Sequence, residues 1–301
     1  MATRVWVRSA RIAGLSVLAA AVAACDVSIG AAEYSVREEK KFTVTGAPEV
    51  VLTTFDGSIE VRGWDRQEVL VEVEKSVVDR AVVDSIQVKA TQVGQTITID
   101  VPKPARIETG SWRRSPSARL VVSVPVQCSV VAKSGDGSIK LRHLAGRIDL
   151  HTGDGSVTAE DVKGELRVHT GDGSIRARGI DGWADIETGD GSVGLEGVLR
   201  TVRVDTSDGS VEVSAGRGSA MDADWSVTTG DGSIRMELPD GFSAELEASS
   251  GDGSVHVEQM TGSQDRARRE RGHDAFKGTL GAGGKLVKLR SGNGSVTVKR
   301  W

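Results

Sequence analysis

The sequence predicts an all-β fold: a parallel β-solenoid, resembling a β-helix, with coils of about 18 residues each and an N-terminal β cap. Three observations predict it. The tetrapeptide Asp-Gly-Ser-Ile/Val recurs along the chain, the four successive intervals from Asp136 to Asp208 are equal, and apolar and polar residues alternate around each copy. A fixed period indicates a repeat architecture. Alternation with a period of two indicates half-buried strands.

The copies account for much of the glycine, which makes up 37 of the 301 residues. Average glycine usage is about 7%. With only 6 prolines, the chain is neither collagen nor a disordered Pro/Gly-rich polymer. The copies, whose turns we expect to be structural, begin at Asp56, Asp136, Asp154, Asp172, Asp190, Asp208, Asp231 and Asp252, with a variant at Asn293.

Each repeat predicts two short strands joined by a Gly-Asp-Gly bend. Two positions before the aspartate lies a hydroxyl residue, as in Thr152 and Thr170, and apolar residues lie four before, three after and five after. A second bend is expected near Gly146, Gly164 and Gly182. Asp-Gly between alternating strands is also a hairpin signal. We favour the solenoid over a meander of hairpins because the same side chains, and not merely the same polarity, recur in each column.

The flanks of the repeat array divide the chain into regions. Residues 42–131, with one early copy at Asp56, predict the N-terminal cap, in which 76–88 could form a short helix. Residues 132–301 predict the solenoid, interrupted at 259–284 by an irregular segment whose charged part is 264–271. The last copy, at Asn293, resumes the pattern. Terminal caps protect a solenoid from edge-to-edge aggregation.

The segment 1–24 predicts a lipoprotein signal peptide. Three arginines precede an apolar run at 12–24, which is too short for a comfortable membrane span. The run ends Val-Ala-Ala before Cys25, which resembles a bacterial lipobox, so we expect acylation of Cys25, with palmitate-like chains, and a tether over 25–41. The alternative is an ordinary secretory signal. Cys128 would then be a single buried thiol, and no intramolecular disulfide is expected.

The Gly-Asp-Gly-Ser-Ile/Val copies, together with 118–132 and 278–295, resemble the bacterial β-strand-repeat family known as domain of unknown function 4097, which carries an adhesin label. The resemblance spans roughly residues 42–301. It implies an extracytoplasmic β-solenoid, often encoded near genes for the cell envelope and its stress responses. It implies no catalytic residues.

Candidate chemistry in the repeats is sparse. A ladder of turn aspartates could bind Ca²⁺, which needs 6–8 oxygen ligands; we favour instead a local turn role in which aspartate bonds backbone N–H groups. His151 and His169 share a column, but that column holds no repeated ligand set, so we expect a solvated ladder and no zinc site. The acids are spread evenly, and no repeat departs from the others to make a special site. We therefore expect no catalytic, cofactor or metal residues.

These features predict a non-catalytic, lipid-anchored module of the bacterial cell envelope, for binding, adhesion or structure. It would lie outside the cytoplasm, on the periplasmic side of the inner membrane or at the outer membrane. A net charge of −4 gives no sign of nucleic-acid binding. The expected partners are the membrane, through the anchor, and an envelope polymer or protein. Alternatives are a carbohydrate-active enzyme on envelope glycans and a self-assembling scaffold.

Overall fold

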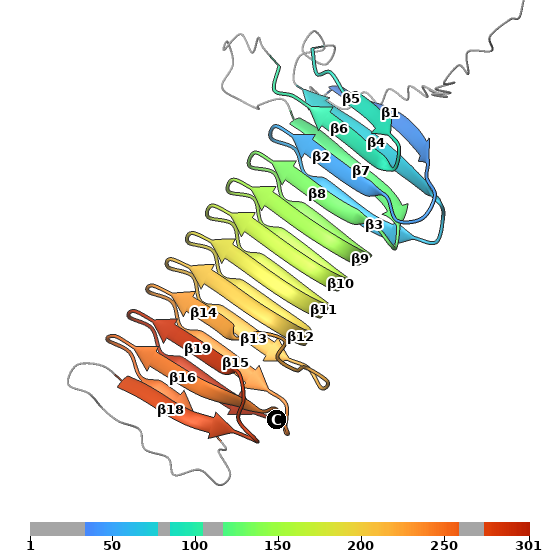
Figure 1. Cartoon of the computed structure of the whole chain (residues 1–301). Helices are drawn as coiled ribbons and strands as arrows, with labels where there is room; N and C mark the ends of the chain where they lie inside the picture. The colour runs from blue at the N-terminus through green and yellow to red at the C-terminus, as the bar shows by residue number, and fades with distance from the viewer. Residues whose placement is uncertain (1–33, 78–84, 105–116, 259–273) are drawn as a thin grey trace, which may run out of the picture.

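The computed structural model describes residues 34–77, 85–104, 117–258 and 274–301. These residues form 20 strands, most of them paired in parallel, in one continuous hydrogen-bonded system (Figure 1). The expected signal peptide, Cys25 and the charged segment 264–271 lie outside the described residues. Within the described ranges, no helix is long and apolar enough to cross a membrane.

The regular part of the molecule is a solenoid of four long strands. They are β9 (Ile139–Thr152), β10 (Val157–Thr170), β11 (Ile175–Thr188) and β12 (Val193–Thr206). Neighbours pair in parallel with partners one repeat apart, such as Val157 with Ile175. The predicted solenoid is confirmed, and the hairpin alternative is wrong because hairpin strands would pair antiparallel.

Each long strand bends back on itself, so that successive Asp-Gly-Ser turns stack along one edge of the rod and the bends along the other (Figure 1). The bend falls where it was predicted, and Gly164 there has a φ of 111°. We call the segments that follow the turns, such as 157–160, the post-turn sheet. The segments that precede the turns, such as 165–170, form the pre-turn sheet.

The core lies between these two sheets. Val157 and Ala159 from the post-turn sheet and Leu166 and Val168 from the pre-turn sheet are at most 1% exposed. The same columns are buried in successive coils, so the interior is one continuous apolar stack. Burial of such side chains contributes about 1.5–3 kcal/mol each, which makes the alternating pattern the main determinant of the fold.

The hydroxyl column ties adjacent turns together. Thr170 Oγ1 donates to the carbonyls of Gly153 (2.9 Å) and Gly155 (3.1 Å) in the preceding turn. In several coils the hydroxyl also accepts from a glycine N–H of its own turn, as Thr206 Oγ1 does from Gly209. The buried hydroxyl therefore satisfies backbone groups of two coils at once.

The N-terminal region contributes coils as well as a cap. The coil of β2 (Glu49–Thr54) and β3 (Ile59–Trp64) lies between β8 (Ser129–Ser134) and β9 on one side and β6 (Thr96–Val101) and β7 (Ser117–Pro125) on the other. Antiparallel strands then close this end: β4 (Glu68–Val77) on β7, β1 (Tyr34–Thr43) on β4, and β5 (Lys89–Val93) on β6. The short helix expected at 76–88 is wrong for its described residues, because Ser76 and Val77 end β4 and 85–88 are not helical, while 78–84 lie outside the described residues. The tether expected over 25–41 is wrong for residues 34–41, which belong to β1.

The C-terminal end departs from chain order. Its strands are β13 (Val211–Ala215), β14 (Trp225–Thr229), β15 (Ile234–Leu238), β16 (Ala244–Ser250), β17 (Val255–Val257), β18 (Asp274–Leu280), β19 (Leu286–Ser291) and β20 (Val296–Arg300). The last coil in sequence, β19 with β20, is inserted between the coil of β14 and β15 and the coil of β16 and β17 (Figure 1). Strand β18 covers β16 in antiparallel fashion. The last copy therefore resumes the pattern inside the stack and not at its end.

Candidate binding surfaces

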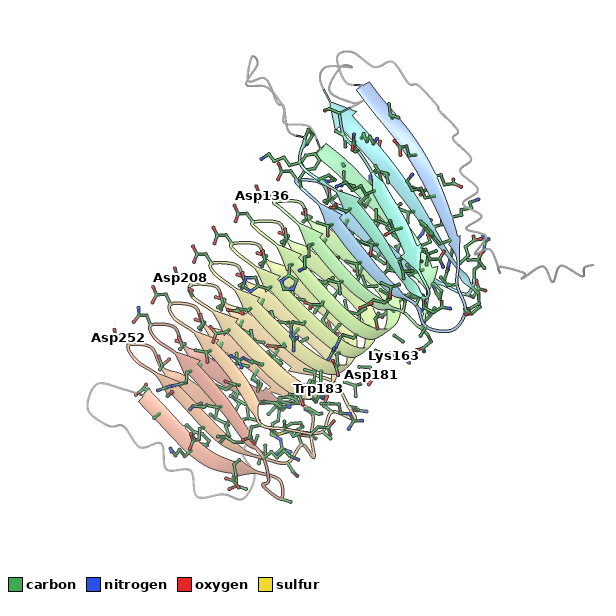
Figure 2. The ribbon with its side chains drawn as sticks, turned by 45° about the horizontal axis from the view of Figure 1, so that its top comes forward. Asp136, Lys163, Asp181, Trp183, Asp208 and Asp252 are labelled. Atoms are coloured by element: carbon green, nitrogen blue, oxygen red, sulfur yellow. The ribbon has the colours of Figure 1, made fainter. Side chains whose placement is uncertain are left out.

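The turn residues predicted from the repeat form a column of acids along one edge of the rod. Figure 2 labels Asp136, Asp208 and Asp252 at successive positions on this edge. The side chains of Asp154, Asp172, Asp190 and Asp231 are exposed in the same column, Asp56 is half-buried, and Asn293 lies between Asp231 and Asp252. The Asn293 amide donates to the Asp231 carboxylate.

Carboxylates of like charge lie close together in the acid column, but among the described residues they do not form a metal-binding cluster. Loss of solvent raises the pKa of Asp208, and the neighbouring carboxylates Asp190 and Asp231 raise it further. Across the described part of the chain, no cluster of three or more His, Cys, Asp or Glu residues is placed to hold a metal ion.

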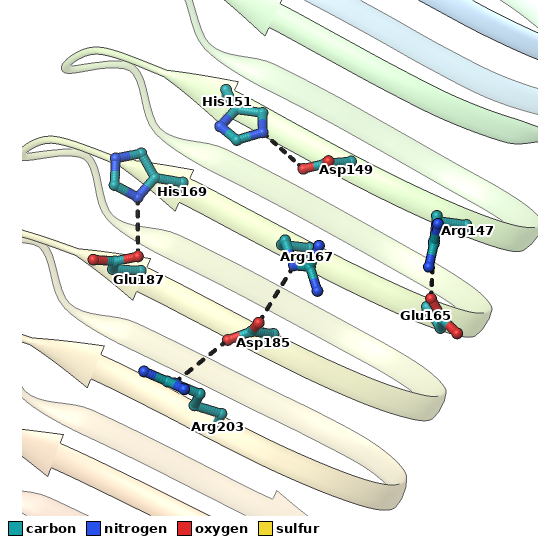
Figure 3. A network of polar contacts seen from close by, with 9 residues as sticks. All are labelled: Arg147, Asp149, His151, Glu165, Arg167, His169, Asp185, Glu187 and Arg203. Carbon is teal, nitrogen blue, oxygen red and sulfur yellow. Dashed lines mark hydrogen bonds and ion pairs between the residues drawn. The ribbon is translucent and has the colours of Figure 1, made fainter.

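His151 and His169 lie side by side on the pre-turn sheet, with ring centroids 6.0 Å apart. Each ring is turned toward a carboxylate: His151 Nε2 lies 2.8 Å from Asp149 Oδ1, and His169 Nδ1 lies 3.3 Å from Glu187 Oε2 (Figure 3). Both imidazoles are thus engaged in separate pairs with acids, as in a solvated ladder.

A groove of about 740 Å³ lies on the outer face of the post-turn sheet. Serines from five successive turns line one side of it: Ser174, Ser192, Ser210, Ser233 and Ser295. Its other polar lining residues include three arginines and two glutamates: Arg176, Arg178, Glu196, Glu212 and Arg235. The groove runs across the coils, since its lining residues repeat from turn to turn.

Gly194 leaves part of this groove open. It occupies an outward position between Arg176 and Glu212 in the register of the sheet. A Cβ built there would meet nothing within 4 Å, whereas a Cβ on the turn glycine Gly173 would lie 2.1 Å from the carbonyl oxygen of Gly155. Coil stacking therefore requires glycine at 173, but neither packing nor backbone conformation requires it at 194.

A second hollow, of about 160 Å³, lies on the pre-turn sheet beside Trp183. Ion pairs cross the coils around it (Figure 3). Arg147 Nε lies 3.0 Å from Glu165 Oε2, and Arg167 Nε lies 3.3 Å from Asp185 Oδ2, while Arg203 Nε lies 3.9 Å from Asp185 Oδ1. The indole of Trp183 is 49% exposed at its rim.

This second hollow coincides with an irregularity in the repeat. The pairing of β11 with β12 shifts register at Ala177/Ile180 and again at Gly182/Trp183. The following bend is enlarged: Ala220 N and Asp222 N donate to the carbonyls of Leu199 and Arg200. One repeat therefore departs from the others in register: β12 carries a bulge that an insertion covers. Bulges are over-represented beside functional sites.

Neither hollow was predicted, although both left a signal in the sequence. At the outward position occupied by Gly194, the other regular repeats carry Lys140, Thr158, Arg176 or Glu212. Trp183 is an aromatic residue in a column whose other members are Arg147, Glu165 and Thr201. Each is an exception in an otherwise polar column, which becomes visible once the columns are aligned.

Cys128 is buried, as expected, and has a free thiol. Burial raises the pKa of this thiol to about 12, with a smaller contribution from Glu49. A thiol that stays protonated at neutral pH is a poor nucleophile, so Cys128 has a packing role.

Comparison with solved structures finds distant likenesses. A candidate lipid-binding protein from Parabacteroides distasonis is 15% identical, with a TM-score of 0.47, and the match covers 88% of this chain and 96% of that one. A candidate adhesin from Bacteroides fragilis is 13% identical, with a TM-score of 0.42, over 88% and 97% of the two chains. No curated protein matches the chain.

The family comparison is more extensive. Residues 38–299 match the family described as Toastrack DUF4097. The match runs from β1 to β20 and includes both the cap strands and the inserted last coil. The chain belongs to the Toastrack DUF4097 family.

Proposed function

We propose that this protein is a non-catalytic, lipid-anchored binding module of the bacterial cell envelope. Its groove on the post-turn sheet would hold an extended polar polymer. The observation that carries the proposal is Gly194, a glycine that the fold does not need, in the lining of a groove of about 740 Å³. A large side chain there would fill the space between Arg176 and Glu212.

The lining of the groove suits a repeating ligand. Strands in a sheet lie about 4.8 Å apart, so the serine hydroxyls recur at that spacing along the groove. One sugar unit of an extended β-1,4-linked glycan has a similar length. Three arginines and two glutamates line the groove, so it offers both donors and acceptors with little net charge. These properties favour an extended glycan strand over a strongly charged polymer.

The expected anchor would set the orientation of the rod. Strand β1 begins at Tyr34, nine residues after Cys25. Nine residues span at most about 30 Å, so lipid at Cys25 would hold the cap end close to the bilayer. The groove, which spans the coils from Ser174 to Ser295, would then stand away from the membrane and face the envelope.

Co-sedimentation with insoluble peptidoglycan sacculi tests the proposal. The full-length protein in detergent is mixed with sacculi, and the bound fraction is compared between wild type, Gly194→Trp and Thr158→Trp. Thr158 occupies the same outward column but lies outside the groove, so Thr158→Trp is the matched control. We expect Gly194→Trp to weaken binding about tenfold or more, a change of about 1.4 kcal/mol, and Thr158→Trp to leave it unchanged.

Two results would overturn the proposal: wild-type protein that stays in the supernatant, or Gly194→Trp protein that sediments like wild type. Release of soluble sugar from the sacculi over time would contradict the non-catalytic part and support the enzyme alternative. For the anchor, Cys25→Ser should move the protein from the membrane fraction to the soluble fraction. If it stays in the membrane fraction, the lipoprotein assignment is wrong.

A further inference from the structure

We infer that the hollow beside Trp183 is a second binding site, which takes a single ring of a neutral sugar. It lies on the pre-turn sheet, whereas the groove of the proposed function lies on the post-turn sheet. The inference goes beyond the proposed function and does not depend on it.

The first argument is the exposure of Trp183. Its indole is 49% exposed in a column in which Glu165 and Thr201 are its partners in the adjacent coils. Because the solenoid forms with Glu165 and Thr201 at the equivalent positions of the adjacent coils, the fold does not require an aromatic ring at position 183. Trp combines a large apolar face with one N–H donor, which makes it common where a ligand is apolar on one side and polar on the other.

The second argument is the chemistry of the rim. Three arginines (Arg147, Arg167, Arg203) and three acids (Asp149, Glu165, Asp185) line the hollow. The rim is thus balanced in charge, and the ion pairs of Arg147 with Glu165 and of Arg167 with Asp185 hold the side chains in place. These groups can donate hydrogen bonds to a ligand with many hydroxyl groups and accept hydrogen bonds from it. A net anionic or cationic ligand would find no excess of opposite charge.

The third argument is the shape of the site. Ile148, Leu166 and Ala184 also line the hollow, and its volume of about 160 Å³ suits one ring and not a chain segment. Within the described residues, the hydroxyl of Thr201 is buried at this hollow without a hydrogen-bond partner. A sugar ring has an apolar C–H face that can stack on the indole and a rim of hydroxyls that can reach the charged groups. A protein partner needs a much larger surface, about 800 Å² on each side.

The register shift at Gly182/Trp183 supports the same inference. The first shift displaces residues 180–182 by one position, so that Gly182 pairs with Leu199, and the second restores the 18-residue register, so that Trp183 pairs with Thr201. The displaced bend is held by the insertion that follows β13, where Ser219 Oγ accepts from Leu199 N at 2.9 Å. The hollow therefore begins at Trp183, directly beside a local departure from the repeat. Figure 2 shows Trp183 on the bend side of the rod, near Lys163 and Asp181.

Calorimetric titration of the full-length protein in detergent tests this inference. The probes are three neutral hexasaccharides: cellohexaose, N-acetylated chitohexaose and maltohexaose. The variants are Trp183→Ala, Trp183→Phe and Trp301→Ala. Trp301 is the matched control because its indole is also exposed, at 50%, but it lies at the far end of the chain under the guanidinium of Arg217.

We expect at least one hexasaccharide to bind at millimolar concentration or below. Trp183→Ala should weaken that binding about tenfold or more, Trp183→Phe should restore part of it, and Trp301→Ala should leave it unchanged. Failure of all three sugars to bind wild type would overturn the inference, as would equal losses in Trp183→Ala and Trp301→Ala. Gly194→Trp separates the two proposals, because it should leave hexasaccharide binding at Trp183 intact whether or not it affects sacculi.

Discussion

The hydroxyl two positions before each turn aspartate connects successive coils. It donates to glycine carbonyls of the neighbouring turn and, in several coils, accepts from its own turn. A buried carbonyl that loses its donor costs more than the hydrogen bond itself contributes. The recurrence of Thr or Ser in this column therefore reflects a need for a hydroxyl and not merely for a small polar side chain.

Thr170→Val should destabilise the protein. The substitution keeps the shape of the side chain but removes the donor to Gly153 and Gly155, which lie 2.9 and 3.1 Å from Oγ1. We expect the free energy of unfolding to fall by about 1–3 kcal/mol in a urea titration. The control is Thr158→Val on the outward face of the same coil, for which a change within about 0.5 kcal/mol is expected. Equal effects of the two substitutions would contradict this role.

The cysteines give a second prediction at this scale. With the pKa of Cys128 raised to about 12 by burial, its thiol should not react with Ellman's reagent at pH 8 in native protein purified from membranes. After denaturation one thiol should react if Cys25 is acylated, and two if it is not. A fast-reacting thiol in the native protein that persists in Cys25→Ser would show that Cys128 is accessible.

The same shift has a consequence for stability. Because folding raises this pKa from 9.0, the folded state favours the protonated thiol. That contribution is complete below about pH 9 and declines as the pH rises toward 12.

At the scale of the elements, the sequence predicted the strands better than their order. The alternating columns gave the two strands of each coil and the register of one repeat between neighbours. They could not predict which coils lie side by side, because every copy presents nearly the same apolar column and can stack on any other. The insertion of β19 and β20 between earlier coils, and of β2 and β3 between β6–β7 and β8–β9, depends on non-local pairing. The hydroxyl bonds follow this spatial order: Ser291 donates to Gly232, and Ser250 donates to Gly294.

Hydrogen exchange should reveal the inserted coil. Strand β20 has partners on both sides, β15 and β17, whereas β17 has three residues and pairs only with β20 among the described strands. We expect amides of β20 to exchange as slowly as those of β11, and amides of β17 to exchange much faster. Mass spectrometry of peptides from the two regions measures this. If β20 exchanged as fast as β17, the last coil would lie at the end of the rod.

The two hollows could not be predicted from the sequence for a related reason. A repeat pattern displays what the copies share, and both hollows depend on where one copy differs. Gly194 looks like one more glycine among 37, until its open surroundings separate it from the turn glycines. Trp183 becomes notable only when the bulge and the surrounding ion pairs are placed around it.

Along the molecule as a whole, the two ends differ from the middle. Antiparallel strands β4 and β1 close the post-turn sheet at the cap end, and β1 carries the charged run Glu38, Glu39, Lys40 and Lys41. Charged edge strands discourage pairing with another copy. At the other end, β18 lies antiparallel on β16. These features argue against the scaffold alternative, in which parallel coils of separate molecules would stack end to end.

Glycine serves two purposes along the rod. Turn glycines permit the coils to stack, and Gly194 keeps a surface open. Substitution of glycine by alanine should therefore have different effects on the free energy of unfolding at the two kinds of position. In Gly173→Ala the new Cβ would lie 2.1 Å from the backbone oxygen of Gly155, so the coils must shift; in Gly194→Ala it would meet nothing within 4 Å.

The free energy of unfolding of these two variants, measured by urea titration against wild type, decides whether glycine has both roles. Gly173→Ala should lose about 1–3 kcal/mol, as for an overpacked core. Gly194→Ala should be unchanged or gain about 0.4–1 kcal/mol, because alanine restricts the unfolded chain. Equal losses in both variants would contradict the division, since Gly194 would then be another structural glycine and the groove a by-product of the fold.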